Sequence, residues 1–300
     1  MRPPIFHTGF HKTGTTFLQY SFWPNVVGYT YSREDSSQIK DILLSPYSGY
    51  FSPDEAKQQI HDVCSGPFIC SSEEFSTNPN LGGFNGLARI ESYRRIAKVF
   101  PEAKLVVMIR EQKEMIKSLY VQYVKLGGTA TIHQLLDPHG RLRALNPGFS
   151  FEYYDYDKFI DEVLEYWPKE QVYLYNYDDL KTNQTSFLNK LSKDLEFTYE
   201  LGLIDKEKSN VSMRYWTLKM LRILNRFSAD LLVEKHYHFH IPFFFAASRK
   251  LMKFVDSHMP GNPKIQSEEI LGAGLCQHID RIYERSNAQL LDKHGIQFNK

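Results

Sequence analysis

The sequence predicts an α/β protein with a mostly parallel central sheet flanked by helices. Four short runs rich in β-branched and aromatic residues recur along the chain, at 4–9, 67–72, 104–110 and 171–177. A helical pattern precedes each run except the first. Strands that alternate with helices indicate βαβ units and a parallel sheet buried on both faces. In such sheets ligands bind beyond the carboxyl ends of the strands, so the residues after each strand are the candidates for a site.

The helices between the strands are predicted from caps and apolar spacing. Ser52 precedes Pro53 and Glu55, a capping-box pattern that predicts a helix over 52–64. Apolar residues at helical spacing predict further helices at 88–100, 157–167 and 184–195.

After about residue 205 the strand pattern ends and only helical patterns follow. We expect a long helix over 213–235 and further helices within 248–256 and 268–295. No repeat or linker interrupts the chain. The sequence therefore predicts one domain over 1–300, with an α/β core at 1–205 and a helical C-terminal extension at 206–300.

Composition excludes several classes of function. The 36 Lys and Arg residues nearly balance 35 Asp and Glu, and a net charge of +1 argues against a non-specific nucleic-acid binder. Three widely spaced cysteines, Cys64, Cys70 and Cys276, argue against a disulfide framework and favour a reducing compartment. No apolar run has the length of a signal peptide or of a membrane span. We therefore expect a cytoplasmic protein.

The loop after the first strand has the features of an anion site. It reads Gly9-Phe10-His11-Lys12-Thr13-Gly14-Thr15-Thr16 and opens a helix. The two glycines permit a tight turn whose N–H groups converge on an anion, and the helix N-terminus favours negative charge. The glycine spacing is that of a Walker phosphate loop, but Thr15 occupies the position of the Walker lysine. Lys12 lies two residues before the second glycine instead.

The residues after the third strand suggest a second phosphate site. A Walker NTPase would carry an acidic metal ligand there, whereas this chain has Arg110, with Ser118 eight residues later on a predicted helix. A guanidinium and a hydroxyl can bind phosphate without a metal.

The ends of the second and fourth strands offer a base and an aromatic ring. Glu73 and Glu74 follow the second strand, where one of them could act as a general base or both could begin a helix capped by Ser72. Tyr177 ends the fourth strand and could either flank a nucleobase or pack in the core.

Together these residues resemble the sulfotransferases that use 3′-phosphoadenosine 5′-phosphosulfate (PAPS). The segment GFHKTGTT at 9–16 matches the family's G-x-x-K-[ST]-G-T-T loop, which binds the 5′-phosphosulfate. Arg110 and Ser118 match the family's 3′-phosphate site. Phe17 matches the aromatic residue that lies against the adenine, and residues 177–180 match the family's Y-x-D-L pattern. The resemblance covers most of 4–215 and, more weakly, 285–296. The implied nucleotide-binding residues are Gly9, His11, Lys12, Thr13, Gly14, Thr15, Thr16, Phe17, Arg110, Ser118 and Tyr177.

The resemblance also implies a mechanism and a branch. The family's base position falls on Glu73, with Glu74 as the substitute, where the cytosolic branch has His. The Arg-Lys-Gly triplet of that branch is absent, and 209–214 is the candidate replacement. These features place the chain nearer the bacterial and carbohydrate-type enzymes. We expect in-line transfer from PAPS, with PAP as product and no metal, in which Lys12 neutralises the leaving phosphate oxygen and Glu73 activates an acceptor hydroxyl.

Several alternatives remain at this point. The expected acceptor is a glycan or glycolipid, and a small hydroxylated metabolite is the alternative. A P-loop kinase and a non-catalytic nucleotide-binding protein are the rivals of different class.

Three stretches have less defined roles. The stretch 31–51 is expected to cover the acceptor cleft. His236, His238 and His240 alternate, so a strand would place them on one face as zinc ligands, but we favour an acceptor-site or surface role. The stretch 241–255 mixes apolar and basic residues; we favour a packed helix or an acceptor wall over a membrane-surface segment.

Overall fold

A computed structural model describes residues 2–76, 86, 88–136, 149–200, 213–229, 237–259 and 261–298. A four-stranded parallel sheet in the order β3-β1-β4-β5 forms its centre. The strands are β1 (Ile5–Gly9), β3 (Ile69–Ser71), β4 (Lys104–Ile109) and β5 (Val172–Asn176). All four coincide with the predicted apolar runs, and the predicted fold class is confirmed.

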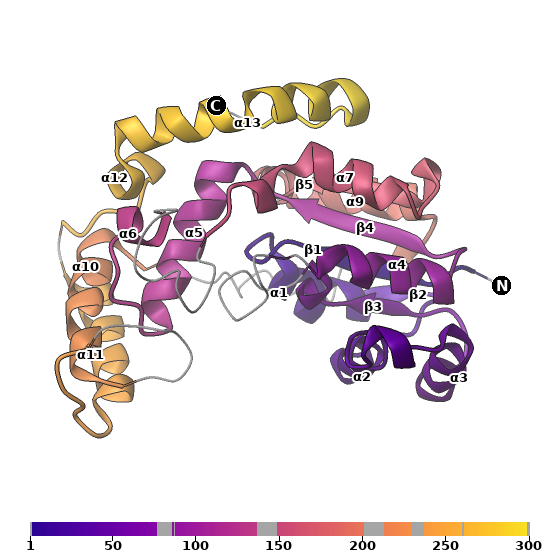
Figure 1. Cartoon of the computed structure of the whole chain (residues 1–300), viewed down its shortest axis with the longest axis horizontal. Coiled ribbons are helices and arrows are strands. Elements are labelled where there is room, and N and C mark those ends of the chain that lie inside the picture. The colour runs from indigo at the N-terminus through magenta and orange to yellow at the C-terminus, as the bar shows by residue number, and fades with distance from the viewer. Residues whose placement is uncertain are drawn as a thin grey trace.

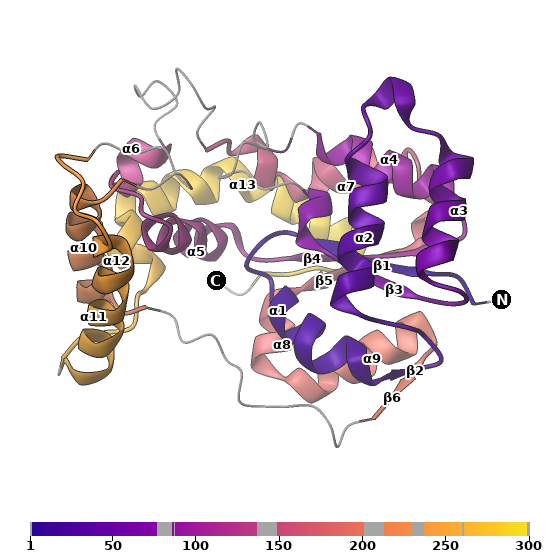
Figure 2. The same cartoon turned by 90° about the horizontal axis from the view of Figure 1, so that it is seen from below.

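Alternation along the strands divides the core into two layers, because successive side chains of a strand point to opposite faces of the sheet. Phe6, Leu105 and Val107 join one buried cluster, whereas Ile5, Val106 and Met108 join the other. Figure 2 shows helices on both sides of the sheet, with α4 and α7 on one side and α8 and α9 on the other. Their bounds are α4 (Arg89–Val99), α7 (Tyr156–Leu164), α8 (Tyr177–Thr182) and α9 (Gln184–Leu195).

The described residues of the N-terminal half contribute further helices. These are α1 (Thr15–Phe17), α2 (Arg33–Leu44), α3 (Pro53–Val63) and α5 (Gln112–Lys125). A π-helical turn over Leu18–Phe22 and a 3-10 turn over Trp23–Asn25 continue α1. The cap of α3 forms as predicted on its serine side, since Ser52 Oγ accepts a hydrogen bond from Glu55 N. A small antiparallel pair, β2 (Val26–Val27) with β6 (Thr198–Tyr199), lies outside the main sheet.

The C-terminal region is helical, as predicted. Its described helices are α10 (Tyr215–Leu224), α11 (Phe244–His258), α12 (Ser267–Leu271) and α13 (Ala273–His294), whereas the short α6 (Ile132–Leu136) follows α5 in the first half of the chain. Figure 1 shows α13 lying along α7 and α5. Their contacts include Lys293 Nζ with Asp157 and Asn287 with Gln112.

The predicted helix over 213–235 is wrong in its extent. It ends at Leu224, followed by a 3-10 turn over Asn225–Phe227 and an extended Ser228. Buried Asn225 donates hydrogen bonds to the carbonyls of Val124 and Gly128, which fixes the chain at this point. The predicted 268–295 helix is likewise divided at Gly272, whose φ is 77°.

Candidate active site

The loop after β1 is held in a tight, left-handed turn. Gly14 has a φ of 86°, and a Cβ there would lie 2.8 Å from the Tyr177 ring. Lys12 has a φ of 70°, a conformation that is uncommon outside glycine. Such backbone strain persists only when the surroundings fix it, and it clusters at functional sites. The uncommon backbone conformation of Lys12 therefore marks this loop as a candidate functional site.

Packing beneath the loop provides that support. The buried Phe10 ring packs against Tyr153, Tyr156 and Phe159. Thr13 Oγ1 donates a 2.6 Å hydrogen bond to the Phe10 carbonyl, so its hydroxyl proton is used within the loop. Thr15 Oγ1 is buried without a partner among the described residues, and the Thr16 side chain is exposed. Among these hydroxyls, that of Thr15 is therefore the buried one that could bond to a ligand.

Lys12 is surrounded by charges of both signs. Partial burial lowers the pKa of Lys12, the positive charges of Lys125 and Arg110 lower it further, and Glu73 partly offsets them. The amine therefore lies where Lys125, Arg110 and Glu73 all act on it. A negatively charged ligand would relieve the repulsion among the three cations.

Arg110 lies directly against the loop. Its Nη1 donates to the Lys12 carbonyl over 3.3 Å, and its Nη2 lies 2.9 Å from Glu114 Oε2. Its side chain is nearly buried, and Nε has no partner among the described residues. Ser118 is half-buried on α5, on the same helix face as Glu114 and one turn beyond it. The structure records no direct contact between Ser118 and Arg110.

Tyr177 joins the loop to Arg110. Its ring edge packs at Gly14, and the Arg110 guanidinium carbon lies 5.0 Å from the ring centroid. Tyr177 therefore packs, as one of its two interpretations predicts, and the residues it packs against are Gly14 and Arg110 of the predicted site. Phe17, on α1, is partly buried and packs against the second core cluster together with Tyr177.

The two glutamates after β3 have different surroundings. They lie in a 3-10 turn over Glu73–Ser76, where Ser72 Oγ accepts from Glu74 N. Glu74 Oε2 lies 2.6 Å from Lys40 Nζ, while Glu73 Oε1 lies 3.7 Å from His11 Nδ1. Burial lowers the pKa of His11, although the charges of Glu73 and Glu74 act in the opposite direction. Glu73 is the carboxylate that faces the loop.

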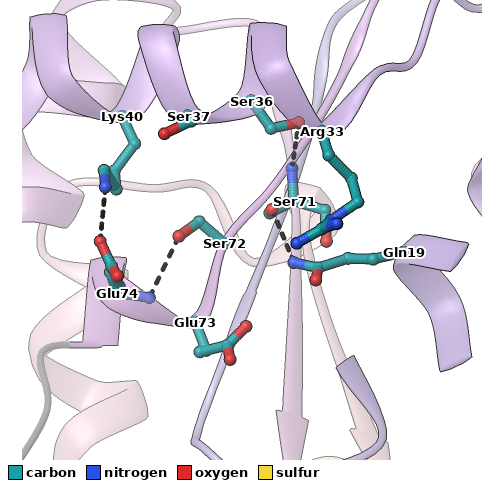
Figure 3. A pocket seen from close by; sticks show the side chains of 9 residues that line it. All are labelled: Gln19, Arg33, Ser36, Ser37, Lys40, Ser71, Ser72, Glu73 and Glu74. Atoms are coloured by element: carbon teal, nitrogen blue, oxygen red, sulfur yellow. Dashed lines mark hydrogen bonds and ion pairs between the residues drawn. The ribbon is translucent and has the colours of Figure 1, made fainter. Parts of the chain in front are cut away.

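A polar cavity of about 180 Å³ lies beside Glu73, between α2 and the end of β3. Figure 3 shows the side chains that line it: Gln19, Arg33, Ser36, Ser37, Lys40, Ser71, Ser72, Glu73 and Glu74. The sequence predicted that 31–51 covers an acceptor cleft, and α2 supplies four of these residues. Arg33 and Lys40 were not identified from the sequence as site residues. The helical spacing of the polar residues 33, 36, 37 and 40 was the signal that places them on one face of α2.

The site residues fit a ligand with negatively charged groups. Thr15 Oγ1, Arg110 Nε and His11 Nε2 are buried polar atoms without partners in the described part of the chain. Buried polar atoms are normally hydrogen-bonded, so three of them around one loop indicate a ligand site. The positive charges of Lys125 and Arg110 also act on Lys12 of this loop.

The histidine stretch forms no strand over the described residues 237–240, and His236 and 209–212 lie outside those residues. His240 Nδ1 accepts a hydrogen bond from Ala229 N. In the described ranges no group of three His, Cys, Asp or Glu side chains is arranged to hold a metal. None of the described helices is both long and apolar enough to cross a membrane.

Comparison with known proteins identifies the family. Residues 2–236 match the family model described as "Sulfotransferase domain". Curated proteins give no match. A sulfotransferase from Alicyclobacillus acidocaldarius is similar in structure, with 14% identity, a TM-score of 0.44, and 86% of this chain and 96% of that chain covered. Mouse SULT7A1 complexed with PAP is similar with 11% identity, a TM-score of 0.42, and 98% and 89% covered. Since the family match spans well over half of the chain and includes the loop, Glu73, Arg110 and Ser118, this protein belongs to the sulfotransferase family, whose members transfer sulfuryl groups from PAPS.

Proposed function

We propose that this sulfotransferase transfers the sulfuryl group of PAPS to a hydroxyl of a carbohydrate, in a glycan or glycolipid, with Glu73 as the general base. The observation that carries the proposal is the placement of Glu73. Its carboxylate lies beside His11 of the loop and also lines the polar cavity. A base in that position faces the donor site on one side and the acceptor cavity on the other.

The donor would be held by the residues gathered around the loop. PAPS, when bound, supplies an activated sulfuryl group on a phosphate leaving group. The backbone N–H groups of 9–16 and the hydroxyls of Thr15 and Thr16 would hold its 5′ end. Arg110 and Ser118 would hold the 3′-phosphate, and Phe17 would contact the adenine. Tyr177 would contribute by supporting Arg110 against Gly14, as its contacts favour.

Lys12 and Glu73 would divide the chemistry between them. The Lys12 ammonium would offset the negative charge that builds on the leaving oxygen, which stabilises the transition state more than the ground state. Glu73 would accept the proton of the acceptor hydroxyl.

The cavity chemistry supports a carbohydrate acceptor. Every residue that lines it carries a hydroxyl, amide or charged group, which suits a ligand rich in hydroxyls. A small hydroxylated metabolite is the second candidate, because it needs less room than an oligosaccharide in a cavity of about 180 Å³.

A transfer assay with labelled PAPS and a panel of acceptors tests the proposal. Neutral oligosaccharides and glycolipids should accept the label, whereas apolar phenols should not. Transfer to small alcohols or phenols alone would replace carbohydrate with the second candidate. Failure with every acceptor, despite PAP binding, would favour a non-catalytic nucleotide-binding protein. Phosphate transfer from ATP with Mg²⁺ would favour the kinase alternative.

A further inference from the structure

Helices α10 and α11 each expose a continuous apolar stripe. On α10, Trp216, Met220 and Ile223 are 45%, 41% and 54% exposed. Their spacing of four and three residues places them on one helix face, away from the buried Leu218 and Leu221. Patches of exposed apolar side chains on a soluble protein mark an interaction site when they are contiguous.

The stripe on α11 has the same spacing. Ala247, Leu251 and Phe254 follow one another at four and three residues and are exposed. Leu251 and Phe254 are 53% and 61% exposed, whereas Ser248 and Met252 form the buried face of the helix. The two helices pack against each other, and both views place them side by side (Figures 1 and 2).

The segment before α11 adds aromatic side chains on an ordered backbone. Phe243 is 90% exposed and has a φ of 64°, so the chain holds a large apolar ring in water in a strained conformation. Tyr237 and Phe239 are each about half exposed. Hydrogen bonds from His238 N to the Arg226 carbonyl and from Ile241 N to the Phe227 carbonyl fix this segment to the end of α10.

Cations surround these apolar residues, and exposed acids are absent from the described part of the region. Lys219, Arg226, Lys250 and Lys253 are exposed. Across 213–229 and 237–259 the sole carboxylate is Asp256, which is partly buried and accepts from Arg214 N. Over 213–259 the sequence has eight Lys and Arg against three Asp and Glu, of which Asp230 and Glu234 lie outside the described residues. The whole chain has a net charge of only +1, so positive charge is concentrated in this segment.

We propose that this α10–α11 face, defined by the two stripes, residues 237–243 and the four exposed cations, binds the surface of a membrane that contains anionic lipids. Apolar stripes with Trp, Tyr and Phe, flanked by Lys and Arg, are the features of helices that lie in the membrane interface. Anionic headgroups attract such cations. A second copy of the chain is a poorer partner, because a symmetric contact would bring like charges together.

The position of the face agrees with this use. Helices α10 and α11 lie at the opposite end of the molecule from α2 and α3, and the β4 arrow points toward the side that carries α5, α10 and α11 (Figure 1). A membrane bound there would lie on the side of the molecule toward which the carboxyl ends of the strands point.

Co-sedimentation with vesicles tests the proposal without reference to catalysis. The full chain should sediment with phosphatidylglycerol–phosphatidylcholine vesicles and far less with pure phosphatidylcholine, and binding should weaken as salt rises. The variant Lys250→Gln/Lys253→Gln should lower the partition coefficient about 20- to 30-fold. Leu251→Ser/Phe254→Ser should also release the protein, because it removes the apolar contact.

Matched variants elsewhere keep the test specific. Lys181→Gln/Lys190→Gln removes two exposed lysines of α8 and α9, and Tyr47→Ser/Tyr50→Ser removes two rings that are each 84% exposed. Both should bind vesicles as the unchanged protein does. Circular dichroism should show that all four variants are folded, since every substituted side chain is exposed. No binding to anionic vesicles, or equal binding of patch and control variants, would overturn the proposal. A dimer that the Leu251→Ser/Phe254→Ser change dissociates, without vesicle binding, would reassign the face to self-association.

Discussion

The Lys40 ammonium forms a 2.6 Å ion pair with Glu74, whereas the carboxylate of the neighbouring Glu73 lies 3.7 Å from His11 Nδ1. Lys40 lies on α2, 34 residues before Glu74. Lys40 offsets the charge of Glu74 on the α2 side, and Glu73 is the glutamate whose carboxylate lies against the loop at His11. This difference between two adjacent glutamates is the basis for the first prediction.

Glu73→Gln should lower kcat by about 10²- to 10⁴-fold, the usual contribution of a general base. The amide keeps the size of the side chain but cannot accept the proton, so PAP binding measured by calorimetry should persist. Glu74→Gln is the matched control and should lower kcat far less than Glu73→Gln does. Equal losses in the two variants, or full activity of Glu73→Gln, would remove Glu73 from the role of base.

Lys12 should set the alkaline limit of activity. Its pKa is lowered by burial and by the charges of Lys125 and Arg110, so the ammonium loses its proton at a lower pH than an ordinary lysine. If protonated Lys12 is required, kcat/KM for PAPS should fall at high pH as that proton is lost. Removing the nearby charge with Lys125→Met should raise the pKa of Lys12 and move this alkaline limb of the pH–activity profile to higher pH. In Lys12→Ala the limb should vanish and kcat should fall. An unmoved limb in Lys125→Met would show that a different group titrates.

Arg110 should contribute mainly to nucleotide affinity. Arg110→Ala should weaken PAP binding about 10- to 100-fold, the value of hydrogen bonds to a charged group. Ser118→Ala, which removes one neutral donor, should weaken binding by less. Lys117 still pairs with Glu114 in the Arg110 variant, so the fold around α5 should persist. Normal PAP affinity of Arg110→Ala would mean that the 3′-phosphate is bound elsewhere.

Glu114 should make stability sensitive to acid. Burial alone would raise the pKa of the Glu114 carboxyl. Hydrogen bonds from Lys117 and Ser267 and the charge of Arg110 outweigh burial and lower this pKa to about 2. The lowered pKa means that its contribution to stability is complete above its ordinary pKa of 4.5 and is lost as the pH falls toward 2. Urea unfolding of Glu114→Gln should therefore show a weaker loss of stability over this range than the unchanged protein. Glu102→Gln, at an exposed position, should behave like the unchanged protein. Identical pH profiles for both variants would contradict the assignment.

Much of the fold could be predicted because it depends on local patterns. Short apolar runs and periodic helices located the four strands and the helices between them, and the loop sequence at 9–16 indicated the family that the comparison confirms. Helix ends were predicted less well. α10 ends early because Asn225 bonds to Val124 and Gly128, about 100 residues earlier in the chain. No local signal encodes such a contact.

The candidate site was predicted in part for the same reason. The loop, Arg110 and Ser118 follow from spacing along one chain segment each. Their contacts with other parts of the chain did not follow from spacing. Tyr177 packs against Gly14, Glu114 pairs with Arg110, and α2 lines the cavity beside Glu73. The extent of a single domain over 1–300 and the assigned roles of the site residues stay predictions.

The sequence by itself determined the α/β class, the Gly-rich loop after the first strand and the family, because each depends on the order and spacing of neighbouring residues. The tertiary structure alone decided that Glu73 faces the loop and that α10 and α11 expose apolar stripes among cations. Those properties depend on which distant side chains pack together and which remain in water. Burial and charge pairing belong to the folded chain, so a pattern such as 241–255 predicts a helix but leaves its exposed face undetermined.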